Sequence, residues 1–203
     1  MSSPYPSKAL QDAVEAIRTL PGVGERSALR LALHLLGQGE EHIASFAGAI
    51  GRLGTDIHWC SRCHMVCDGP LCSICADEGR DRSRICVVGS VRDVMSIEAT
   101  AQYRGTYHVL GGIISPVDGI GPSDLTISDL VSRLEEGGVG EVILALSGDV
   151  EGETTAFYIY RQIERFGIPV TTLARGLGFG DDLEYADSLT LGRSIAARQP
   201  FKP

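Results

Sequence analysis

Apolar residues near the start of the chain recur with the period of an α-helix. The patterns predict helices over residues 7–20, 25–36 and 41–56. Each helix should bury one stripe of side chains: Leu10, Ala13, Val14, Ile17 and Leu20 on the first, Leu29, Ala32, Leu33 and Leu36 on the second, and Ile43, Phe46, Ile50 and Leu53 on the third. Residues 21–24, Pro-Gly-Val-Gly, interrupt the pattern and predict a tight turn between the first two helices.

After residue 84 the pattern changes to short β-rich runs that alternate with helical patterns. Strands are expected at 85–88, 107–110, 141–146 and 169–173, and helices at about 91–101, 125–136 and 153–166. This alternation is typical of a mainly parallel sheet covered by helices. We therefore expect an α+β chain of several modules: a helical region at 1–58, a cysteine-rich module at 59–76, a charged linker at 77–84, an α/β domain at 85–175 and a C-terminal segment at 176–203.

Composition and charge narrow the class of protein. The chain has 203 residues, of which 43% are hydrophobic, and this fraction is too high for a disordered protein. It contains neither an apolar run of about 20 residues nor a basic N-terminus followed by an apolar block, so we expect a cytoplasmic protein with no membrane contact. The net charge is −8, and the residues after 84 carry nine basic against sixteen acidic side chains. An acidic second half indicates two regions with different partners.

The turn at residues 21–24 has the features of a helix-hairpin-helix. Gly22 and Gly24 lack a Cβ, so the backbone can approach a partner closely, and the free N–H groups of the next helix favour a phosphate. Arg26 and Arg30 lie one helical turn apart and would add charge-assisted contacts to a DNA backbone. Glu25 opposes this interpretation, because a carboxylate repels phosphate. The alternative is a plain helix–helix turn that needs glycines only for packing.

The cysteine-rich module has the spacing of a zinc site. Two Cys-x2-Cys pairs are separated by a short loop, with the cysteines at Cys60, Cys63, Cys72 and Cys75. Such pairs converge on one tetrahedral Zn²⁺, which in a closed four-cysteine site is structural and contributes folding free energy. We expect one zinc ion per chain and favour this over disulfides, since no export signal is visible. Cys67 lies inside the loop, and three interpretations stay open for it: a bystander, a substitute metal ligand or a site prone to oxidation.

Acidic residues gather after predicted strands of the α/β domain. They are Asp149, Glu151 and Glu153 after the strand that ends at Leu146, and Asp118 and Asp124 in a glycine-rich loop. Ligands of parallel sheets bind at the carboxyl ends of strands, so these carboxylates are candidates to hold Mg²⁺ for phosphoryl transfer. We favour instead an acidic face that meets a partner protein. The first strand is followed by Gly89, with no acid to complete a magnesium site.

The order of these motifs resembles the RecR family of bacterial recombination-repair proteins. LPGVGERSALRLALHLL is similar to the family's N-terminal hairpin, and the two Cys-x2-Cys pairs are similar to its zinc finger. ICVVGSVRDVMSIE, YHVLGGIISPVDGIGP and VILALSGDVEGETTAFYI are similar to its Toprim domain, and LEYADSLTLGRSIAAR to its C-terminal segment. The resemblance therefore covers essentially the whole chain.

The resemblance implies a non-enzymatic clamp that binds gapped, single- or double-stranded DNA. Family members form a ring-like tetramer in the nucleoid and act with the partners RecO and RecF to load RecA. It also implies DNA contacts at Gly22, Gly24, Arg26 and Arg30, zinc ligands at Cys60, Cys63, Cys72 and Cys75, and partner contacts near Glu151 and Glu153. The chain departs from the family pattern at Glu25, where proline is common, at Gly89, where glutamate is common, and at Cys67.

Two alternative functions stay open on the sequence alone. One is a Mg²⁺-dependent Toprim enzyme that transfers phosphoryl groups, and the loss of an acid at Gly89 argues against it. The other is a zinc-stabilised adaptor that makes no direct contact with DNA and uses its hairpin only for assembly.

Overall fold

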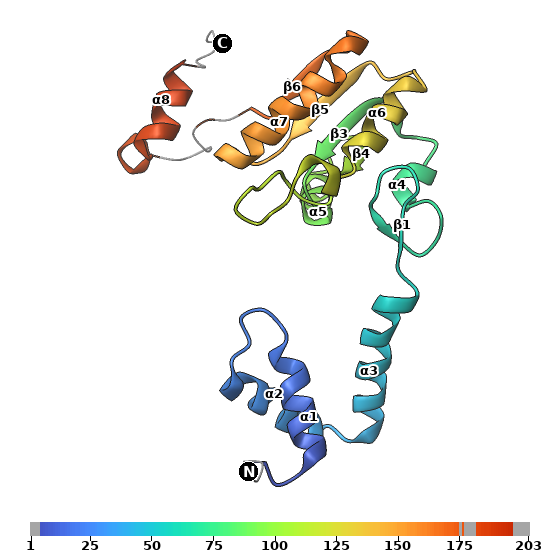
Figure 1. Cartoon of the computed structure of the whole chain (residues 1–203), viewed down its shortest axis with the longest axis vertical. Coiled ribbons are helices and arrows are strands. Elements are labelled where there is room, and N and C mark those ends of the chain that lie inside the picture. Colours follow the sequence, from blue (N-terminus) through green and yellow to red (C-terminus); the bar gives the residue numbers. More distant parts are fainter. Residues whose placement is uncertain (1–4, 175, 177–181, 197–203) are drawn as a thin grey trace. The chain divides into compact units, whose positions relative to one another are not determined.

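A computed structural model describes residues 5–174, 176 and 182–196 of the chain (Figure 1). Arg175, the end of the expected α/β domain, and much of the expected C-terminal segment at 176–203 lie outside the described residues. The chain divides into two compact units, Met1–Ile57 and His58–Pro203. No helix in the described ranges is both long enough and apolar enough to cross a membrane.

The first unit consists of three helices, α1 (Lys8–Arg18), α2 (Glu25–Gly37) and α3 (Glu40–Thr55). Helices α1 and α2 form a hairpin around a small core in which Val14, Ala28 and Ala32 are buried. The two alanines allow the helix backbones to approach closely, and the partly buried Leu10 and Ile17 of α1 pack around this contact. The three expected helices are therefore present, with boundaries within a few residues of those predicted.

Much of the expected burial in this unit is wrong. On α2, Leu33 and Leu36 are 48% and 65% exposed. The stripe on α3 is exposed along its whole length, at Ile43, Phe46, Ile50 and Leu53, and so are Ala13 and Leu20. Helical period identifies an apolar face but not what covers it. Only the faces that α1 and α2 turn toward each other are covered within this unit.

The second unit is built on a four-stranded parallel sheet in the order β4-β3-β5-β6. Its strands are β3 (Asp81–Val88), β4 (Gly105–Val109), β5 (Glu141–Ala145) and β6 (Val170–Thr172), and its main helices are α5 (Val91–Ala99), α6 (Ile127–Glu135) and α7 (Val150–Ile163). Shorter elements are β1 (His58–Trp59), β2 (Val66–Cys67), α4 (Ser73–Ala76), η1 (Pro122–Asp124), η2 (Glu164–Phe166), η3 (Leu183–Tyr185) and α8 (Ser188–Ala196). The parallel α/β arrangement expected from the sequence is confirmed.

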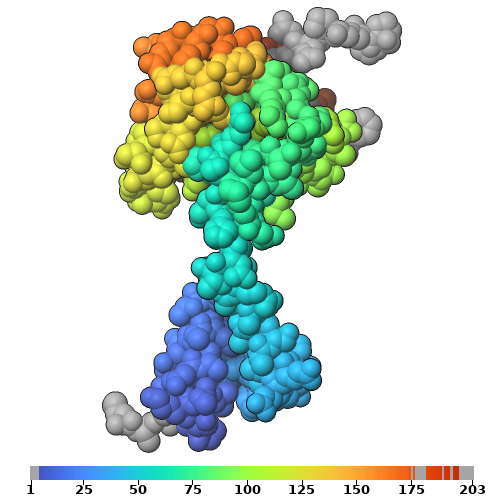
Figure 2. Space-filling view, turned by 90° about the vertical axis from the view of Figure 1, so that its right-hand side faces the viewer, coloured from blue at the N-terminus to red at the C-terminus, as the bar shows by residue number. Residues whose placement is uncertain are grey.

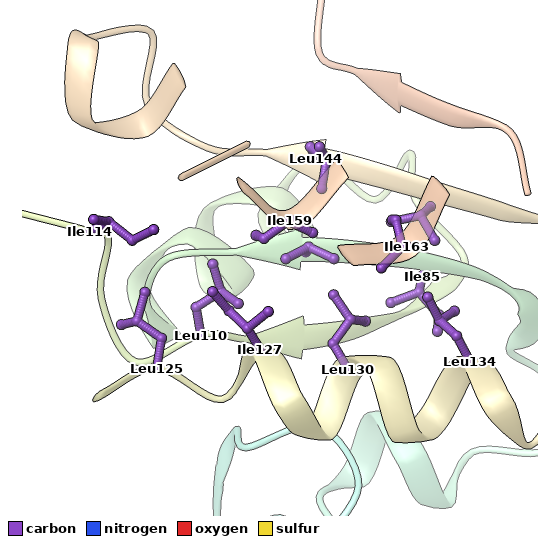
Figure 3. Close-up of a cluster of buried hydrophobic side chains, with 12 residues drawn as sticks. Ile85, Leu110, Ile114, Leu125, Ile127, Leu130, Leu134, Leu144, Ile159 and Ile163 are labelled. Atoms are coloured by element: carbon purple, nitrogen blue, oxygen red, sulfur yellow. The ribbon is translucent and has the colours of Figure 1, made fainter. Parts of the chain in front are cut away.

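Both faces of this sheet are covered, as parallel sheets require. On one face Ile85 and Val142 meet α6 and α7, and Figure 3 shows Leu130 of α6 and Ile159 of α7 directed into this core. The alternate positions, which include Val88 and Tyr107, face the other way and pack against α5 and the cysteine-rich module. Period-two alternation thus places one set of side chains on each face.

Two elements begin three or more residues earlier than expected. Strand β3 begins at Asp81, so the last four residues of the segment interpreted as a linker are part of a strand, with a register irregularity between Asp81 and Ile85. Helix α7 begins at Val150, three residues earlier than expected, because Asp149 caps it. Glu151 and Glu153 consequently lie in the first helical turn.

Candidate metal centre and nucleic-acid interface

The four cysteines of the two pairs converge on one point. Their Sγ atoms all lie within 4.8 Å of one another, and all four side chains are buried. The Sγ atoms of Cys63 and Cys72 are 3.5 Å apart. Four sulfurs at about 2.3 Å from a tetrahedral zinc are about 3.8 Å apart, so the cluster has the dimensions of such a site. In the described part of the chain, no other group of three or more His, Cys, Asp or Glu side chains is placed to hold a metal.

Local backbone hydrogen bonds shape each cysteine pair. In the first pair, His64 N donates to Cys60 O at 2.9 Å and Cys60 N donates to Met65 O at 2.7 Å. This turn places His64 in the left-handed region, with φ of 60°. In the second pair, Cys75 N donates to Cys72 Sγ at 3.4 Å. Each Cys-x2-Cys segment therefore turns back on itself and presents both sulfurs to the same side.

The thiols shift one another's pKa values. A hydrogen bond from Cys63 lowers the pKa of Cys75 to about 6, and the same contact raises the pKa of Cys63. Burial raises the pKa of Cys72 to about 11. Four thiolates therefore do not form side by side at neutral pH unless a cation balances them, and a bound Zn²⁺ would supply this charge.

Cys67 does not belong to the metal group. It is half-buried in β2, and its Sγ donates to Gly69 O at 2.9 Å. Its thiol therefore has a structural hydrogen bond, and the structure gives it no further role.

The cysteine-rich module is attached to the sheet of the second unit. Val109 N, at the end of β4, donates to Cys63 O at 2.8 Å. Met65 and Ile74 pack against the sheet face that contains Tyr107. In the space-filling view the module, coloured teal, lies directly against the body of this unit (Figure 2). The metal ligands are thus held by the α/β domain as well as by their own turns.

The hairpin of the first unit exposes the N-terminus of α2. Gly22 has φ of 77°, which favours glycine, whereas Gly24 has φ of −80° and is the N-cap of α2. No side chain caps this helix end, and a Cβ built on Gly24 would meet no atom within 4 Å. Arg26 and Arg30 are both exposed on α2. The structure thus brings together the four residues predicted for DNA contact.

A cavity of about 560 Å³ lies at this helix end. Its lining comprises Tyr5, Gly24, Glu25, Arg26, Ser27 and Leu29. Tyr5 Oη donates to the carboxylate of Glu25 at 3.2 Å. Glu25, whose carboxylate would repel phosphate, therefore accepts a hydrogen bond from a neutral hydroxyl.

The acidic residues do not converge on a metal site within the described chain. Asp149 accepts hydrogen bonds from Gly152 N at 2.7 Å and from Ser147 Oγ at 2.9 Å, so its carboxylate caps α7. Asp118 accepts a hydrogen bond from Ser115 Oγ, and Asp124 accepts one from Gly121 N, so both carboxylates stabilise local turns. Glu151 is half-buried and Glu153 is exposed, both in the first turn of α7. The two predicted partner-binding residues therefore lie on one helix, but they are two positions apart and their side chains point to different sides of it.

Three ionisable residues of this unit have largely covered side chains that were not recognised from the sequence. Arg133 is 6% exposed, and His108 has no exposed surface. The side chain of Arg80 is 9% exposed and forms an ion pair with Glu98. A single arginine or histidine within a helical or β-rich pattern gives no signal of burial, because the elements that cover it are distant in the sequence.

Comparisons with known proteins match the chain in four parts. The matching families are a RecR helix-hairpin-helix over residues 10–53, a RecR zinc finger domain with four cysteines over 58–77, a Toprim domain over 83–174, and a RecR C-terminal region over 176–199. These matches agree with the four-cysteine geometry, and they confirm the expected module order and mixed α+β fold.

Curated relatives match along the full length. A recombination protein RecR of Bacteroides thetaiotaomicron is 53% identical over 201 residues, which cover 99% of this chain and 98% of the relative. The RecR of Porphyromonas gingivalis is 53% identical over 201 residues, which cover 99% and 97%. The RecR of Flavobacterium johnsoniae is 51% identical over 198 residues, which cover 98% and 96%.

Proposed function

This chain belongs to the RecR family of recombination proteins, and we propose that it is a non-enzymatic DNA-binding clamp that mediates recombinational DNA repair. In this role it would bind gapped, single- or double-stranded DNA and promote loading of a RecA-type recombinase. The observation that carries the proposal is the exposed, uncapped N-terminus of α2 beside two exposed arginines.

The DNA contact follows from the geometry of α2. Arg26 and Arg30 are four residues apart, so their side chains lie on one face of the helix. The free N–H groups of the helix N-terminus attract phosphate, and the guanidinium groups add charge-assisted hydrogen bonds. Open space beside Gly24 leaves room for a phosphate to approach the backbone. None of these groups reads a base, so the contact would be independent of sequence.

Assembly of several chains would increase the number of arginine contacts with the DNA. The apolar stripe of α3, which includes Phe46 and Ile50, is exposed in the single chain, and contiguous exposed apolar surface is typical of protein–protein contacts. We propose that it takes part in forming a ring-like tetramer. A tetramer would present four copies of Arg26 and Arg30, and their weak contacts would combine through effective concentration. The net-acidic composition is compatible with DNA binding, because only the contact surface needs positive charge.

The zinc site would have a structural role. All four ligand sulfurs are buried, which leaves no open coordination position for a substrate. Zinc would stabilise a module of few apolar residues and hold it against β4.

A non-enzymatic role is supported by the local hydrogen bonds that the aspartates of the α/β domain form. Asp149, Asp118 and Asp124 form hydrogen bonds that shape turns and helix ends. Position 89, at the end of β3, is glycine. Magnesium is therefore not expected as a cofactor. Mg²⁺-dependent DNA cleavage that disappears in Glu151→Ala would contradict this part of the proposal.

Glu151 and Glu153 are the proposed contacts to partner proteins of the RecO and RecF type. Both lie in the first turn of α7 in the acidic second half of the chain, where Glu153 is exposed and Glu151 is half-buried. Such a surface favours a basic partner and would steer its association. We place this activity in the cytoplasm, at the nucleoid.

The decisive experiment removes both arginines of the hairpin. We expect Arg26→Ala/Arg30→Ala to lower DNA affinity by roughly 10-fold or more, since each charged hydrogen bond contributes about 1.5–3 kcal/mol. Binding to gapped DNA should be measured by fluorescence anisotropy at several salt concentrations. The slope of affinity against salt should also become shallower, because fewer phosphate contacts release fewer counterions.

A matched control removes the same charge elsewhere. Arg161 and Arg165 have side chains that are each 60% exposed in the second unit. Arg161→Ala/Arg165→Ala should bind DNA nearly as well as the unaltered protein. If the hairpin variant keeps full affinity while both variants retain their zinc and their mass, the proposed DNA contact through Arg26 and Arg30 is wrong. Loss of all DNA binding by the unaltered protein at physiological salt would instead favour the adaptor.

A further inference from the structure

Arg133 is a buried cation in the middle of the second unit. It lies in α6, and its residue is 6% exposed. Its Nη1 donates to Tyr107 O at 2.7 Å and its Nη2 donates to Thr106 Oγ1 at 2.8 Å, so it ties α6 to β4. Both acceptors are neutral, and neither balances the charge of the guanidinium group.

No carboxylate within the described residues forms an ion pair with Arg133. Asp129, one turn earlier on α6, pairs with His64 Nε2 at 3.0 Å. Arg80, which is half-buried, forms ion pairs with Glu98 and with Asp77. A buried cation without a counter-charge is strongly destabilising, so the charge of Arg133 needs a partner of another kind.

Arg133 lies beside the ligand loop of the metal site. Ser61, Arg62 and His64, which flank the ligands Cys60 and Cys63, line the same cavity as Arg133. Burial lowers the pKa of Arg133, whereas the neighbouring Cys75, Cys63 and Cys60 raise it. Arg133 further lines a cavity of about 280 Å³ at the junction of the zinc finger and α6, with Ser61, Arg62, His64, Asp129, Ser132 and Glu136.

Metal binding changes the charge of this cluster. Zn²⁺ with four thiolates carries a net charge of about −2, whereas protonated thiols carry none. Arg133 is the buried cation of the Toprim domain whose acceptors are all neutral and which these sulfurs act on.

We propose that Arg133 is the counter-charge of the zinc tetrathiolate, so that zinc binding in the finger stabilises the packing of α6 against β4 in the Toprim domain. Arg133 acts through the thiolates and is a positioning residue. The inference rests on the zinc site and is independent of DNA binding, because the hairpin belongs to the other unit.

Direct contacts reinforce this electrostatic link. Two residues of β4 contact the two partners: Val109 N donates to Cys63 O, and Tyr107 O accepts from Arg133. Strand β4 is therefore bonded both to the ligand loop and to the arginine. The pair of His64 and Asp129 joins the same loop to α6. Loss of zinc would therefore free the ligand loop and leave the charge of Arg133 unbalanced at the same place.

The test compares two replacements that differ in charge. Arg133→Lys keeps the charge but loses the planar fork, whereas Arg133→Gln is neutral but can still donate to Tyr107 O. Zinc affinity of the full chain is measured by competition with a chromogenic chelator. We expect roughly 10-fold to 100-fold weaker zinc binding for the glutamine variant, and close to unaltered binding for the lysine variant.

Thermal unfolding with and without zinc provides the second readout. Arg133→Gln should lower the melting temperature of the zinc-loaded protein more than that of the zinc-free protein. Arg80→Met is the control, since it removes a half-buried arginine that is paired with carboxylates. It should lower both melting temperatures by similar amounts and leave zinc affinity unchanged.

Several results would overturn the proposal. Equal zinc affinity in the glutamine and lysine variants would assign Arg133 to packing alone. If neither variant folds, hydrogen exchange of the unaltered protein still decides the question. Removal of zinc should then reduce protection in α6 and β4, and full retention of that protection would contradict the proposed coupling.

Discussion

At the scale of single residues, burial decides the chemistry of His108. Its side chain has no exposed surface, and its Nε2 lies 2.9 Å from Thr126 O. A carbonyl oxygen only accepts, so Nε2 carries the proton of the neutral ring. Nδ1 is buried and has no partner, and burial lowers the pKa of His108 to about 4. Protonation of the folded protein would create a buried charge without a partner.

Stability should therefore fall as the pH falls through this range. The unfolded histidine binds a proton near pH 6.5, roughly its ordinary pKa, and the folded one only near pH 4. Between these values the unfolded state binds more protons, so acid favours unfolding. We expect His108 to contribute a loss of about 2 kcal/mol between about pH 7 and pH 5. The free energy of unfolding is measured with urea for the unaltered protein and for His108→Gln, each at pH 7 and at pH 5.

The difference between the two proteins isolates this residue, since acid also releases zinc from thiolates. His108→Gln should lose less stability over the same interval. If both proteins lose equal stability, His108 is not the group that titrates.

At the scale of elements, the two glycines of the hairpin have different tasks. Gly22 is in the left-handed region, which side chains rarely adopt, so it is required by the turn. Gly24 has an ordinary φ and open space beside it, so it is not required by the fold. The two glycines could not be distinguished from the sequence, because the spacing of glycines does not determine their φ angles.

Substitution should separate these tasks. Gly22→Ala should destabilise the protein by about 1–2 kcal/mol through backbone strain. Gly24→Ser should change stability by only a few tenths of a kcal/mol, since serine is a good N-cap. Its side chain would nevertheless occupy the place where a phosphate approaches, which should weaken DNA binding by about 1 kcal/mol, roughly fivefold. Thermal unfolding and DNA anisotropy of both variants measure the two effects. Unchanged DNA binding in Gly24→Ser would place the phosphate elsewhere.

At the scale of the whole molecule, the exposed stripe of α3 is the feature on which the proposed assembly depends. Phe46 is 49% exposed and Ile50 is 54% exposed, one turn apart on the same helix. Burying such side chains contributes about 1.5–3 kcal/mol each. A charge placed there would oppose assembly without disturbing the hairpin core, which lies between α1 and α2.

We expect Phe46→Asp/Ile50→Asp to reduce the assembly to smaller species. Light scattering measures the mass, and elemental analysis should still find about one zinc per chain. Val117→Asp is the control, because Val117 is an exposed apolar residue of the second unit. A tetrameric mass for both variants would remove α3 from the interface.

The sequence by itself determined the elements and the zinc ligands. Strand and helix period, and the spacing of Cys60, Cys63, Cys72 and Cys75, depend on backbone geometry over a few residues, and both were predictable for that reason. Only the tertiary structure decided which apolar faces are covered, that Asp149 caps α7, and that Arg133 and His108 are buried. These properties arise where elements distant in the sequence meet, and their desolvation and pairing depend on neighbours that no local pattern specifies.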